Sequence, residues 1–437
     1  MPKKARPSPN SKPQDNFNLP PKLLNTLSYL SKYSPYYKKL LARHSRKPLE
    51  KWTWEIFRAL PLTTKSHLIR HPEDFFCISS HRIKEWSSTS GTTGEPLYVP
   101  LSEGDLRRLA RNEAWTFRMA GLRRGDVLQI CITLDKRFMA GLAYWLGARK
   151  AGISVIRMGP GVLPLQWQTM HQRQVTALLA VPSFIPRLLE YAQSQGIDPQ
   201  SLSVRTLIAV GEPTIDENCR PNALCQSITQ QWPLNIVSTY ASTELQTAYT
   251  ECPQHTGLHA QDDLVYTEIL DDEGRPVEEG QAGQLVFTHF GVEAMPMLRY
   301  ATGDIVRVWR SPCPCGLTSL RIGPVVGRRE LRLKVNGTTI YPEQYVRLLN
   351  DCGLSQQFQL TIAHEKEQHD KLMLFISEKA QMRVTYDFFL RTFRDHNLPV
   401  PEIHWIPDDL LVKKLFPESK RKPQVILDLR NSMQNAP

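Results

Sequence analysis

The sequence has no uninterrupted apolar run near the roughly 20 residues that a membrane helix requires. Its first residues, Met1-Pro-Lys-Lys-Ala-Arg-Pro-Ser8, lack the apolar stretch of a secretory signal, so we expect an intracellular, cytoplasmic protein. In a reducing compartment its eight cysteines are not expected to form a disulfide framework. Five scattered cysteines are interpreted as buried or inert thiols: Cys77, Cys131, Cys219, Cys225 and Cys352.

The sequence also lacks internal repeats and recognised nucleic-acid-binding motifs. Its net charge of +11 is dispersed over local clusters at Lys3–Arg6, Lys38–Lys47 and Lys413–Lys422 and is not gathered into one stripe. A solvated basic surface is the simpler interpretation, and attraction of anionic ligands is the functional one. We therefore expect no nucleic-acid partner.

The length of 437 residues predicts at least two domains, because one hydrophobic core seldom grows past roughly 250–300 residues. Residues 1–17 are rich in Pro, Lys, Ser and Asn and are expected to be a disordered basic tail. Apolar and aromatic residues recur at helical spacing from Leu23 to Leu41, which predicts packing helices. A further helix is expected to begin after Thr63 or Thr64.

The middle of the chain has the pattern of an α/β protein. Between residues 126 and 241, short apolar runs alternate with longer helical patterns, which predicts a parallel sheet flanked by helices. The predicted strands are 127–133, 153–157, 177–181, 206–210 and 236–240, and the predicted helices include 140–150 and 185–194.

The pattern changes twice more. Strand-like runs at 264–270, 284–289 and 305–308 are separated by turn residues and predict a smaller antiparallel sheet. After Glu330, mixed strand and helix patterns continue to the C-terminus. We therefore expect a large N-terminal domain at 18–329 and a small α+β domain at 330–437.

The segment Thr89-Ser-Gly-Thr-Thr-Gly-Glu-Pro96 has the composition of a phosphate-binding loop. Gly91 and Gly94 permit a tight turn, and hydroxyl groups beside backbone N–H groups can wrap a polyphosphate. The hydroxyls belong to Ser90, Thr92 and Thr93. The common nucleotide loop needs a Lys directly after its last Gly, and Glu95 occupies that place, which weakens kinase and P-loop NTPase interpretations.

Three further segments follow in fixed order: Tyr240-Ala-Ser-Thr-Glu244, Arg299-Tyr-Ala-Thr-Gly-Asp304 and Gly327-Arg-Arg-Glu330. A Thr-Glu pair alone is equally typical of a helix N-cap with an acid in the first turn. Its place after the predicted strand favours a ligand site, because ligands in open α/β sheets bind beyond the carboxyl ends of the strands.

With these four segments the chain resembles the phenylacetate–coenzyme A ligase branch of the adenylate-forming (AMP-binding) enzymes. The likeness covers nearly the whole chain after the tail. It also rests on Ser34-Pro-Tyr-Tyr37, Leu60-Pro-Leu-Thr-Thr-Lys65, Gly121-Leu-Arg-Arg-Gly-Asp126, Gly211-Glu-Pro213 and Gly337-Thr-Thr-Ile-Tyr-Pro342. The resemblance implies a mobile C-terminal domain and an ATP-dependent ligase that activates an aryl or small hydrophobic acid and transfers it to coenzyme A.

The resemblance implies roles for single residues in the nucleotide site. Thr92 and Thr93, with the backbone of the loop glycines, would cradle the β- and γ-phosphates. Tyr240 would lie against adenine, Thr243 would hydrogen-bond the α-phosphate, and Glu244 would hold Mg²⁺, a hard cation suited to a carboxylate. Other implied contacts come from Ser90, Gly91, Gly94, Gly211, Glu212 and Pro213.

The resemblance also implies roles near the C-terminal domain. Asp304 would accept both ribose hydroxyls, and Arg328 would contact ribose or phosphate. Glu330 stands at the hinge, where the family usually has an Asp. Lys422 falls where the family has a lysine between the substrate carboxylate and the α-phosphate, whose mutual repulsion an ammonium offsets. Arg421 and Pro423 flank it where small residues are usual, so a plain basic surface loop stays an alternative.

A second constellation consists of Cys252, two histidines and Cys313-Pro-Cys315. Three thiolates and one imidazole suit tetrahedral Zn²⁺, and two cysteines on a Pro/Gly-rich turn can reach one ion. Some phenylacetate-ligase-like proteins carry this pattern as a structural zinc site. His259 is the favoured ligand, and His255 is expected to be solvated.

Several alternatives stay open at this point. The same chemistry could load a carrier protein or an amine, and a nucleotide-binding homologue could lack catalysis, given departures such as Glu95 and Ala241. The expected partners are a small carboxylic acid, ATP and coenzyme A. The oligomeric state, a dimer included, also stays open.

Overall fold

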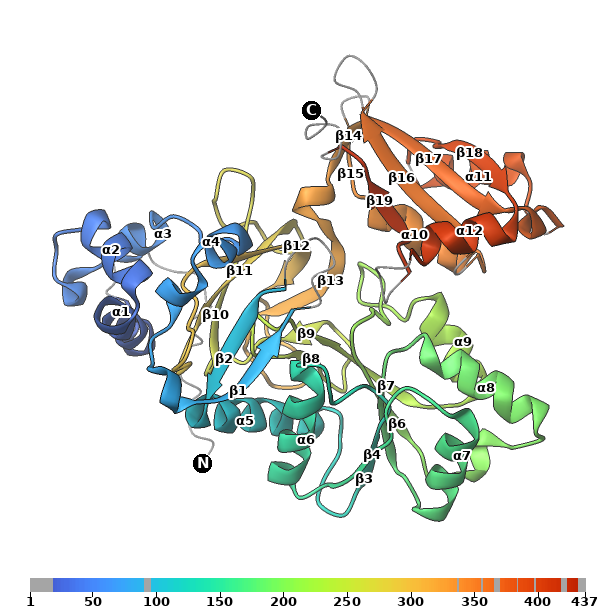
Figure 1. The fold of residues 1–437 in the computed structure, drawn as a ribbon, viewed down its shortest axis with the longest axis horizontal. Helices are drawn as coiled ribbons and strands as arrows, with labels where there is room; N and C mark the ends of the chain where they lie inside the picture. Colours follow the sequence, from blue (N-terminus) through green and yellow to red (C-terminus); the bar gives the residue numbers. More distant parts are fainter. Residues whose placement is uncertain are drawn as a thin grey trace. The chain divides into compact units, whose positions relative to one another are not determined.

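The computed structural model describes residues 19–89, 96–335, 338–354, 357–364, 370–382, 384–396, 398–417 and 423–430. The chain forms two compact units, an N-terminal unit of Met1–Thr302 with Val306–Pro324 and a C-terminal unit of Gly303–Ile305 with Val325–Pro437 (Figure 1). None of the helices in the described part combines the length and apolar character that crossing a bilayer requires. The predicted tail at 1–17 lies outside the described residues.

Short helices open the N-terminal unit. The predicted helical region 23–41 forms two helices, α1 (Pro21–Tyr33) and α2 (Pro35–His44). They divide at Ser34, whose hydroxyl accepts from the backbone N–H of Tyr37 at 3.3 Å and so caps α2. Helices α3 (Trp54–Arg58) and α4 (Lys65–Arg70) follow, and α4 begins after Thr64 as predicted.

The main sheet has eleven strands in the order β10-β11-β12-β13-β9-β8-β7-β6-β5-β3-β4. All five strands predicted between residues 126 and 241 are present and pair in parallel with one another. They are β3 (Val127–Ile130), β4 (Ser154–Arg157), β5 (Ala177–Ala180), β6 (Thr206–Ala209) and β7 (Asn235–Tyr240).

Helices cover both faces of this parallel part (Figure 1). Side chains alternate between two faces along each strand, so Leu178 and Leu207 pack into one core and Leu179 and Ile208 into another. The first core contains residues of α7 (Leu163–Gln172), α8 (Phe184–Ser194) and α9 (Ala223–Gln231). The second contains residues of α5 (Glu103–Met119) and α6 (Met139–Ala151).

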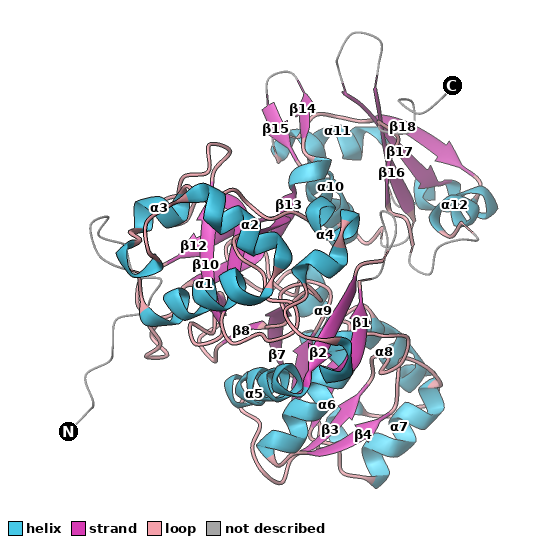
Figure 2. Cartoon of the chain, turned by 60° about the vertical axis from the view of Figure 1, so that its left-hand side comes forward, coloured by secondary structure: helices cyan, strands magenta, loops and turns pink. Residues whose placement is uncertain are grey.

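The three strand-like runs expected after Glu251 are present as β10 (Val265–Leu270), β11 (Ala282–His289) and β12 (Tyr300–Trp309). Three further strands, β8 (Tyr249–Glu251), β9 (Leu258–His259) and β13 (Arg321–Arg328), were not predicted, and the antiparallel β7–β8 pair joins all six to the parallel part in one mixed sheet. A separate hairpin is formed by β1 (Ile83–Ser88) and β2 (Tyr98–Ser102) (Figure 2).

The C-terminal unit has the expected α+β composition, with a four-stranded sheet in the order β18-β17-β16-β19. The sheet strands are β16 (Phe358–His364), β17 (Asp370–Ser377), β18 (Glu402–Ile406) and β19 (Ile426–Asp428), and β14 (Leu333–Val335) and β15 (Thr338–Ile340) form a hairpin. The helices are α10 (Pro342–Asp351), α11 (Tyr386–Asp395) and α12 (Asp408–Leu415). Tyr345 of α10 and Phe389 of α11 pack with Leu360 and Leu374 of the sheet in one apolar core.

Candidate nucleotide site and Cys/His cluster

A tight turn follows β7 and carries Thr243 and Glu244. The Ser242 hydroxyl accepts from the backbone N–H of Leu245 at 3.1 Å, and the Ser242 carbonyl accepts from the N–H of Gln246 at 3.2 Å. Glu244 is buried, with 9% of its surface exposed. The segment continues directly into β8 without forming a helix, so the interpretation of the Thr-Glu pair as a helix N-cap is wrong.

The neighbouring strands end in loops that carry other predicted residues. Gly211 follows β6 with a φ of +80°, a left-handed conformation that favours glycine. The Glu212 carboxylate accepts from the Ser183 backbone N–H at 3.0 Å and from its hydroxyl at 2.9 Å, which links the loops after β5 and β6. The Pro213 carbonyl accepts from the Asn222 side chain at 2.9 Å. These loops stand at the carboxyl ends of adjacent parallel strands, where open α/β sheets bind ligands.

Tyr240 closes β7 and is half-buried. Its ring meets the ring of Tyr249 edge-on, with centroids 6.0 Å apart and an interplanar angle of 61°. Tyr249 is fully buried and its hydroxyl lies 2.6 Å from the Thr267 hydroxyl. A fixed aromatic neighbour orients the Tyr240 ring, as a planar ligand such as a purine would require.

Two predicted elements lie outside the described residues: the loop residues Ser90, Gly91, Thr92, Thr93 and Gly94, and the lysine Lys422. The ends of the loop are described. The Thr89 N–H donates to the Leu97 carbonyl at 3.0 Å, and the Leu97 N–H donates to the Thr89 hydroxyl at 3.0 Å. These bonds extend the β1–β2 ladder, so the predicted phosphate loop connects the two strands of a hairpin.

Asp304 and Arg328 are close together within the C-terminal unit. The Asp304 carboxylate lies 3.3 Å from Arg328 Nε, and 15% and 55% of the two side chains are exposed. Glu330 lies in the short 3₁₀ helix η5 (Arg329–Leu331), and its carbonyl accepts from Arg430 at 3.3 Å. Arg430 also pairs with Asp428 at 2.8 Å, so β19 is tied to the segment that contains the predicted hinge.

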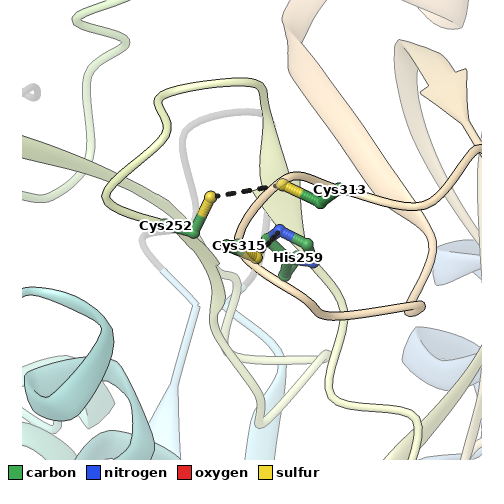
Figure 3. A group of neighbouring side chains, drawn as sticks. All are labelled: Cys252, His259, Cys313 and Cys315. Carbon is green, nitrogen blue, oxygen red and sulfur yellow. Dashed lines mark hydrogen bonds between the residues drawn. The ribbon is translucent and has the colours of Figure 1, made fainter.

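The four predicted zinc ligands form one compact cluster (Figure 3). Cys252 follows β8, His259 ends β9, and Cys313 and Cys315 lie on the turn between β12 and β13. All four ligand atoms lie within 4.8 Å of one another. The Cys252 and Cys313 sulfurs are 3.6 Å apart, and the Cys315 sulfur is 3.5 Å from His259 Nε2.

This donor set fits a tetrahedral ion. With Zn–S distances of about 2.3 Å and Zn–N distances of about 2.0 Å, a tetrahedral site separates two sulfurs by about 3.7 Å and a sulfur from a nitrogen by about 3.5 Å. His259 Nδ1 lies 2.9 Å from the Ser319 hydroxyl, so Nε2 is the nitrogen left to face Cys315. Burial lowers the pKa of His259 to about 4, which keeps the imidazole in the neutral form that binds metals.

His255 is placed differently from expectation. Its Nδ1 lies 3.3 Å from the carboxylate of Glu251, which is 1% exposed, and the imidazole is only 40% exposed. The hydrogen bond with Glu251 raises the pKa of His255. The expectation that His255 is simply solvated is therefore wrong, because it partners a buried acid beside the cluster.

The chain is similar to known proteins in sequence and in fold. A family model described as "AMP-binding enzyme" matches residues 87–294. Phenylacetate-coenzyme A ligase of Pseudomonas putida is 30% identical over 332 residues, which cover 75% of this chain and 73% of that protein. The enzyme of the same name from Escherichia coli K12 is 26% identical over 384 residues, covering 86% and 85% of the two chains.

A solved structure of 2-hydroxyisobutyryl-CoA ligase, in the postadenylation state in complex with R3-HIB-AMP, has the same fold. Its TM-score is 0.76 at 19% identity, over 98% of this chain and 96% of that chain. The 30% identity over 73% of the Pseudomonas putida ligase, together with the AMP-binding match, places the chain among the adenylate-forming enzymes, whose fold it shares. Within that class, the chain belongs to the phenylacetate–coenzyme A ligase family.

Three buried residues that hydrogen-bond the chain just after the Thr243–Glu244 turn were not predicted. Arg108 and Asn112 of α5 and His289 of β11 hydrogen-bond the residues that follow Glu244. The one available signal was a charged and an amide side chain on the apolar face of an amphipathic helix. Such residues are buried only when they are hydrogen-bonded.

Proposed function

We propose that this protein is an ATP-dependent, AMP-forming ligase that activates a small carboxylic acid as an acyl-adenylate and transfers the acyl group to coenzyme A. The observation that carries the proposal is the turn with Thr243 and Glu244, which follows β7, while the Gly211–Pro213 loop follows the adjacent parallel strand β6. Membership of the phenylacetate–coenzyme A ligase family supports the same reaction. An aryl or other small hydrophobic acid is the proposed substrate class.

In the first half-reaction, a carboxylate oxygen attacks the α-phosphorus of ATP and the bond to pyrophosphate breaks. Glu244 would hold Mg²⁺, which supplies positive charge to the phosphates. Thr243 would donate to the α-phosphate, and Lys422 would lie between the two anions that must approach each other. Tyr240 would lie against the adenine ring, Asp304 would contact the ribose, and Arg328 would contact ribose or phosphate.

In the second half-reaction, the thiol sulfur attacks the mixed anhydride, AMP leaves and a thioester forms. We propose that the C-terminal domain at 330–437 turns at Glu330 between the two steps, relative to the domain at 18–329. Coenzyme A is the proposed acceptor because a chain with a net charge of +11 attracts a polyanionic thiol. A cytoplasmic location belongs to this proposal, since ATP and coenzyme A are metabolites of that compartment.

The test separates the half-reactions. ATP–pyrophosphate exchange is measured over a panel of aryl and short aliphatic acids without any thiol, and thioester formation is then measured with coenzyme A. Lys422→Ala should abolish exchange but leave thiol transfer from a preformed adenylate comparatively intact, and Glu244→Gln should lose the Mg²⁺-dependent activity. Absence of exchange with every acid would contradict the proposal, and exchange without a coenzyme A product would point to a carrier protein or an amine as acceptor.

We also propose that Cys252, His259, Cys313 and Cys315 bind one structural Zn²⁺. The distances and the neutral imidazole support this set, and four protein ligands leave no open position for chemistry. Metal analysis of protein purified without added metal should find about one Zn²⁺ per chain. Cys313→Ser should lose it and lower the melting temperature, whereas Cys352→Ser, outside the cluster, should retain it. Metal-free wild-type protein with an unchanged melting temperature would contradict the site.

A further inference from the structure

One face of α5 follows the chain that leaves the Thr243–Glu244 turn. Arg108, Asn112 and Thr116 are spaced four residues apart and therefore lie along one stripe of the helix. Asn112 Oδ1 accepts from the Ala248 N–H at 3.2 Å, and the Thr116 hydroxyl lies 2.9 Å from the Thr250 hydroxyl. Arg108 hydrogen-bonds Gln246 and Thr247, so the three side chains of the stripe contact the segment 246–250 in the order of the sequence.

The Arg108 guanidinium is the centre of this support. Its Nη1 donates to the Gln246 carbonyl at 2.6 Å, and its Nη2 donates to the Thr247 hydroxyl at 2.9 Å and to the Leu264 carbonyl at 2.6 Å. Its Nε donates to the Phe290 carbonyl at 2.9 Å. None of these four acceptors is a carboxylate. The cation therefore fixes backbone geometry and does not neutralise a directly bound acid. The planar guanidinium carries N–H donors in a fixed, forked arrangement, so it makes several directed bonds at once.

The residue that Arg108 holds is conformationally strained. Gln246 has a φ of +49°, a left-handed conformation that is unfavourable for a residue with a side chain. Its side-chain amide is buried and has no hydrogen-bond partner among the described residues, so the side chain does not stabilise this conformation. The backbone before it is also fixed, because His289 Nε2 donates to the Leu245 carbonyl at 2.8 Å. Such strain persists only where the surrounding structure enforces it.

From these contacts we infer that Arg108 is a positioning residue, which holds the turn so that Thr243 and Glu244 present their oxygens to the nucleotide and its Mg²⁺. This inference rests on the proposed function of that turn. Arg108 reaches the turn only through the residues after Glu244, so its loss should disturb Mg²⁺-dependent chemistry more than the binding of the acid.

The test compares Arg108→Lys with Arg111→Lys. Arg111 lies on the same helix, is 55% exposed and pairs with Asp263 at 2.6 Å, so it is a matched control for the same chemical change. In Arg108→Lys the charge remains but the fork is lost. We expect the rate of pyrophosphate exchange to fall about 10- to 100-fold and the Mg²⁺ concentration for half-maximal rate to rise, with the KM for the acid unchanged. Arg111→Lys should match the wild type. If Arg108→Lys does not fold, Thr247→Val removes a single acceptor and should give the same shift to a smaller degree.

Hydrogen–deuterium exchange provides a second measurement that needs no substrate. Amides of residues 245–250 should lose protection in Arg108→Lys and keep it in Arg111→Lys, while strands β3 and β5 stay protected in both. Wild-type rates and Mg²⁺ dependence in Arg108→Lys, or equal shifts in the Mg²⁺ and acid constants, would overturn the inference. Wild-type protein that exchanges no pyrophosphate would refute the proposed function instead, and the amide measurement would still decide whether Arg108 holds the turn.

Discussion

The two units of this protein are stabilised by different kinds of interior. The N-terminal unit buries several charged side chains, including Asp105, Arg108, Glu113, Glu268 and Arg299. In the described part of the C-terminal unit, the buried polar residues are Gln359, Thr361 and Ser377, and none carries a charge. Its core consists of apolar side chains from two helices and a sheet. Apolar packing is sufficient to fold a small α+β unit, whereas the strained loops of the larger unit need directed bonds.

Arg299 is a second buried arginine that hydrogen-bonds backbone carbonyls beside one of the predicted motifs. It precedes the Tyr300–Asp304 segment and has a φ of +45°. Its guanidinium makes a two-point contact with the Glu268 carboxylate, at 3.1 Å from Nε and 3.1 Å from Nη2, and donates to the Leu60 carbonyl at 2.6 Å. Like Gln246, Arg299 is not a glycine and yet has a left-handed backbone conformation. Here, however, the buried cation has a buried anion as its partner.

The largest expected effect breaks this pair. Glu268→Gln leaves Arg299, whose side chain is 3% exposed, without its counter-charge. Removing one partner of a buried ion pair costs about 3–5 kcal/mol, because the other charge stays desolvated. The loss is measured as the free energy of unfolding in urea, and hydrogen exchange in β10 and β11 shows whether it is located at this pair. Glu217→Gln, which breaks the more exposed pair with Arg307, should cost less than about 1 kcal/mol, and equal losses in the two variants would contradict the difference.

A smaller effect is expected from the apolar interior of the C-terminal unit. Leu360→Ala removes a fully buried side chain from β16 and should destabilise that unit by about 2–4 kcal/mol, because a cavity replaces packed atoms. Hydrogen exchange should increase in α10 and α11 and stay unchanged in α5. Val412→Ala, at a position that is 55% exposed, is the control. A comparable loss of protection in α5 would mean that the two interiors are not independent.

The smallest effect concerns pH. Glu113 is fully buried, and burial raises its pKa from 4.5 to about 8. The folded state therefore holds this proton more tightly than the unfolded state. The resulting stabilisation is complete below pH 4.5 and is lost as the pH rises through 8. Between pH 7 and pH 8.5 the wild type should lose about 1 kcal/mol relative to Glu113→Gln, whose amide does not ionise.

The measurement is the free energy of unfolding of both proteins between pH 7 and pH 8.5. The variant should gain on the wild type as the pH rises over this range. Parallel curves would show that Glu113 does not titrate in this window.

The sequence predicted the features that have a local pattern. The strands β3 to β7 were predicted within a few residues, since buried parallel strands are short apolar runs between helical segments. The set of Cys252, His259, Cys313 and Cys315 was also predicted, because its residue types are rare and chemically distinctive. The two-residue strand β9 was not predicted, since so short an element has no measurable period.

The support of the turn could not be predicted for a different reason. Arg108 is separated by 138 positions from Gln246 and by 182 from Phe290. Contacts of this kind depend on how α5 packs against the sheet, and no pattern of spacing along the sequence predicts them. His255 was misjudged for a similar reason, because its partner Glu251 is identified only by the geometry of the β8 end.

The Cys/His cluster has a further consequence, for the unfolded chain. Cys252 and Cys313 are separated by 61 positions, so an ion bound to both would close a loop that contains β9 to β12. Closing such a loop removes conformational entropy from the unfolded ensemble, and this loss grows only with the logarithm of loop length. The hairpins inside the loop can therefore gain or lose residues during evolution with little change in the contribution of the cross-link to stability.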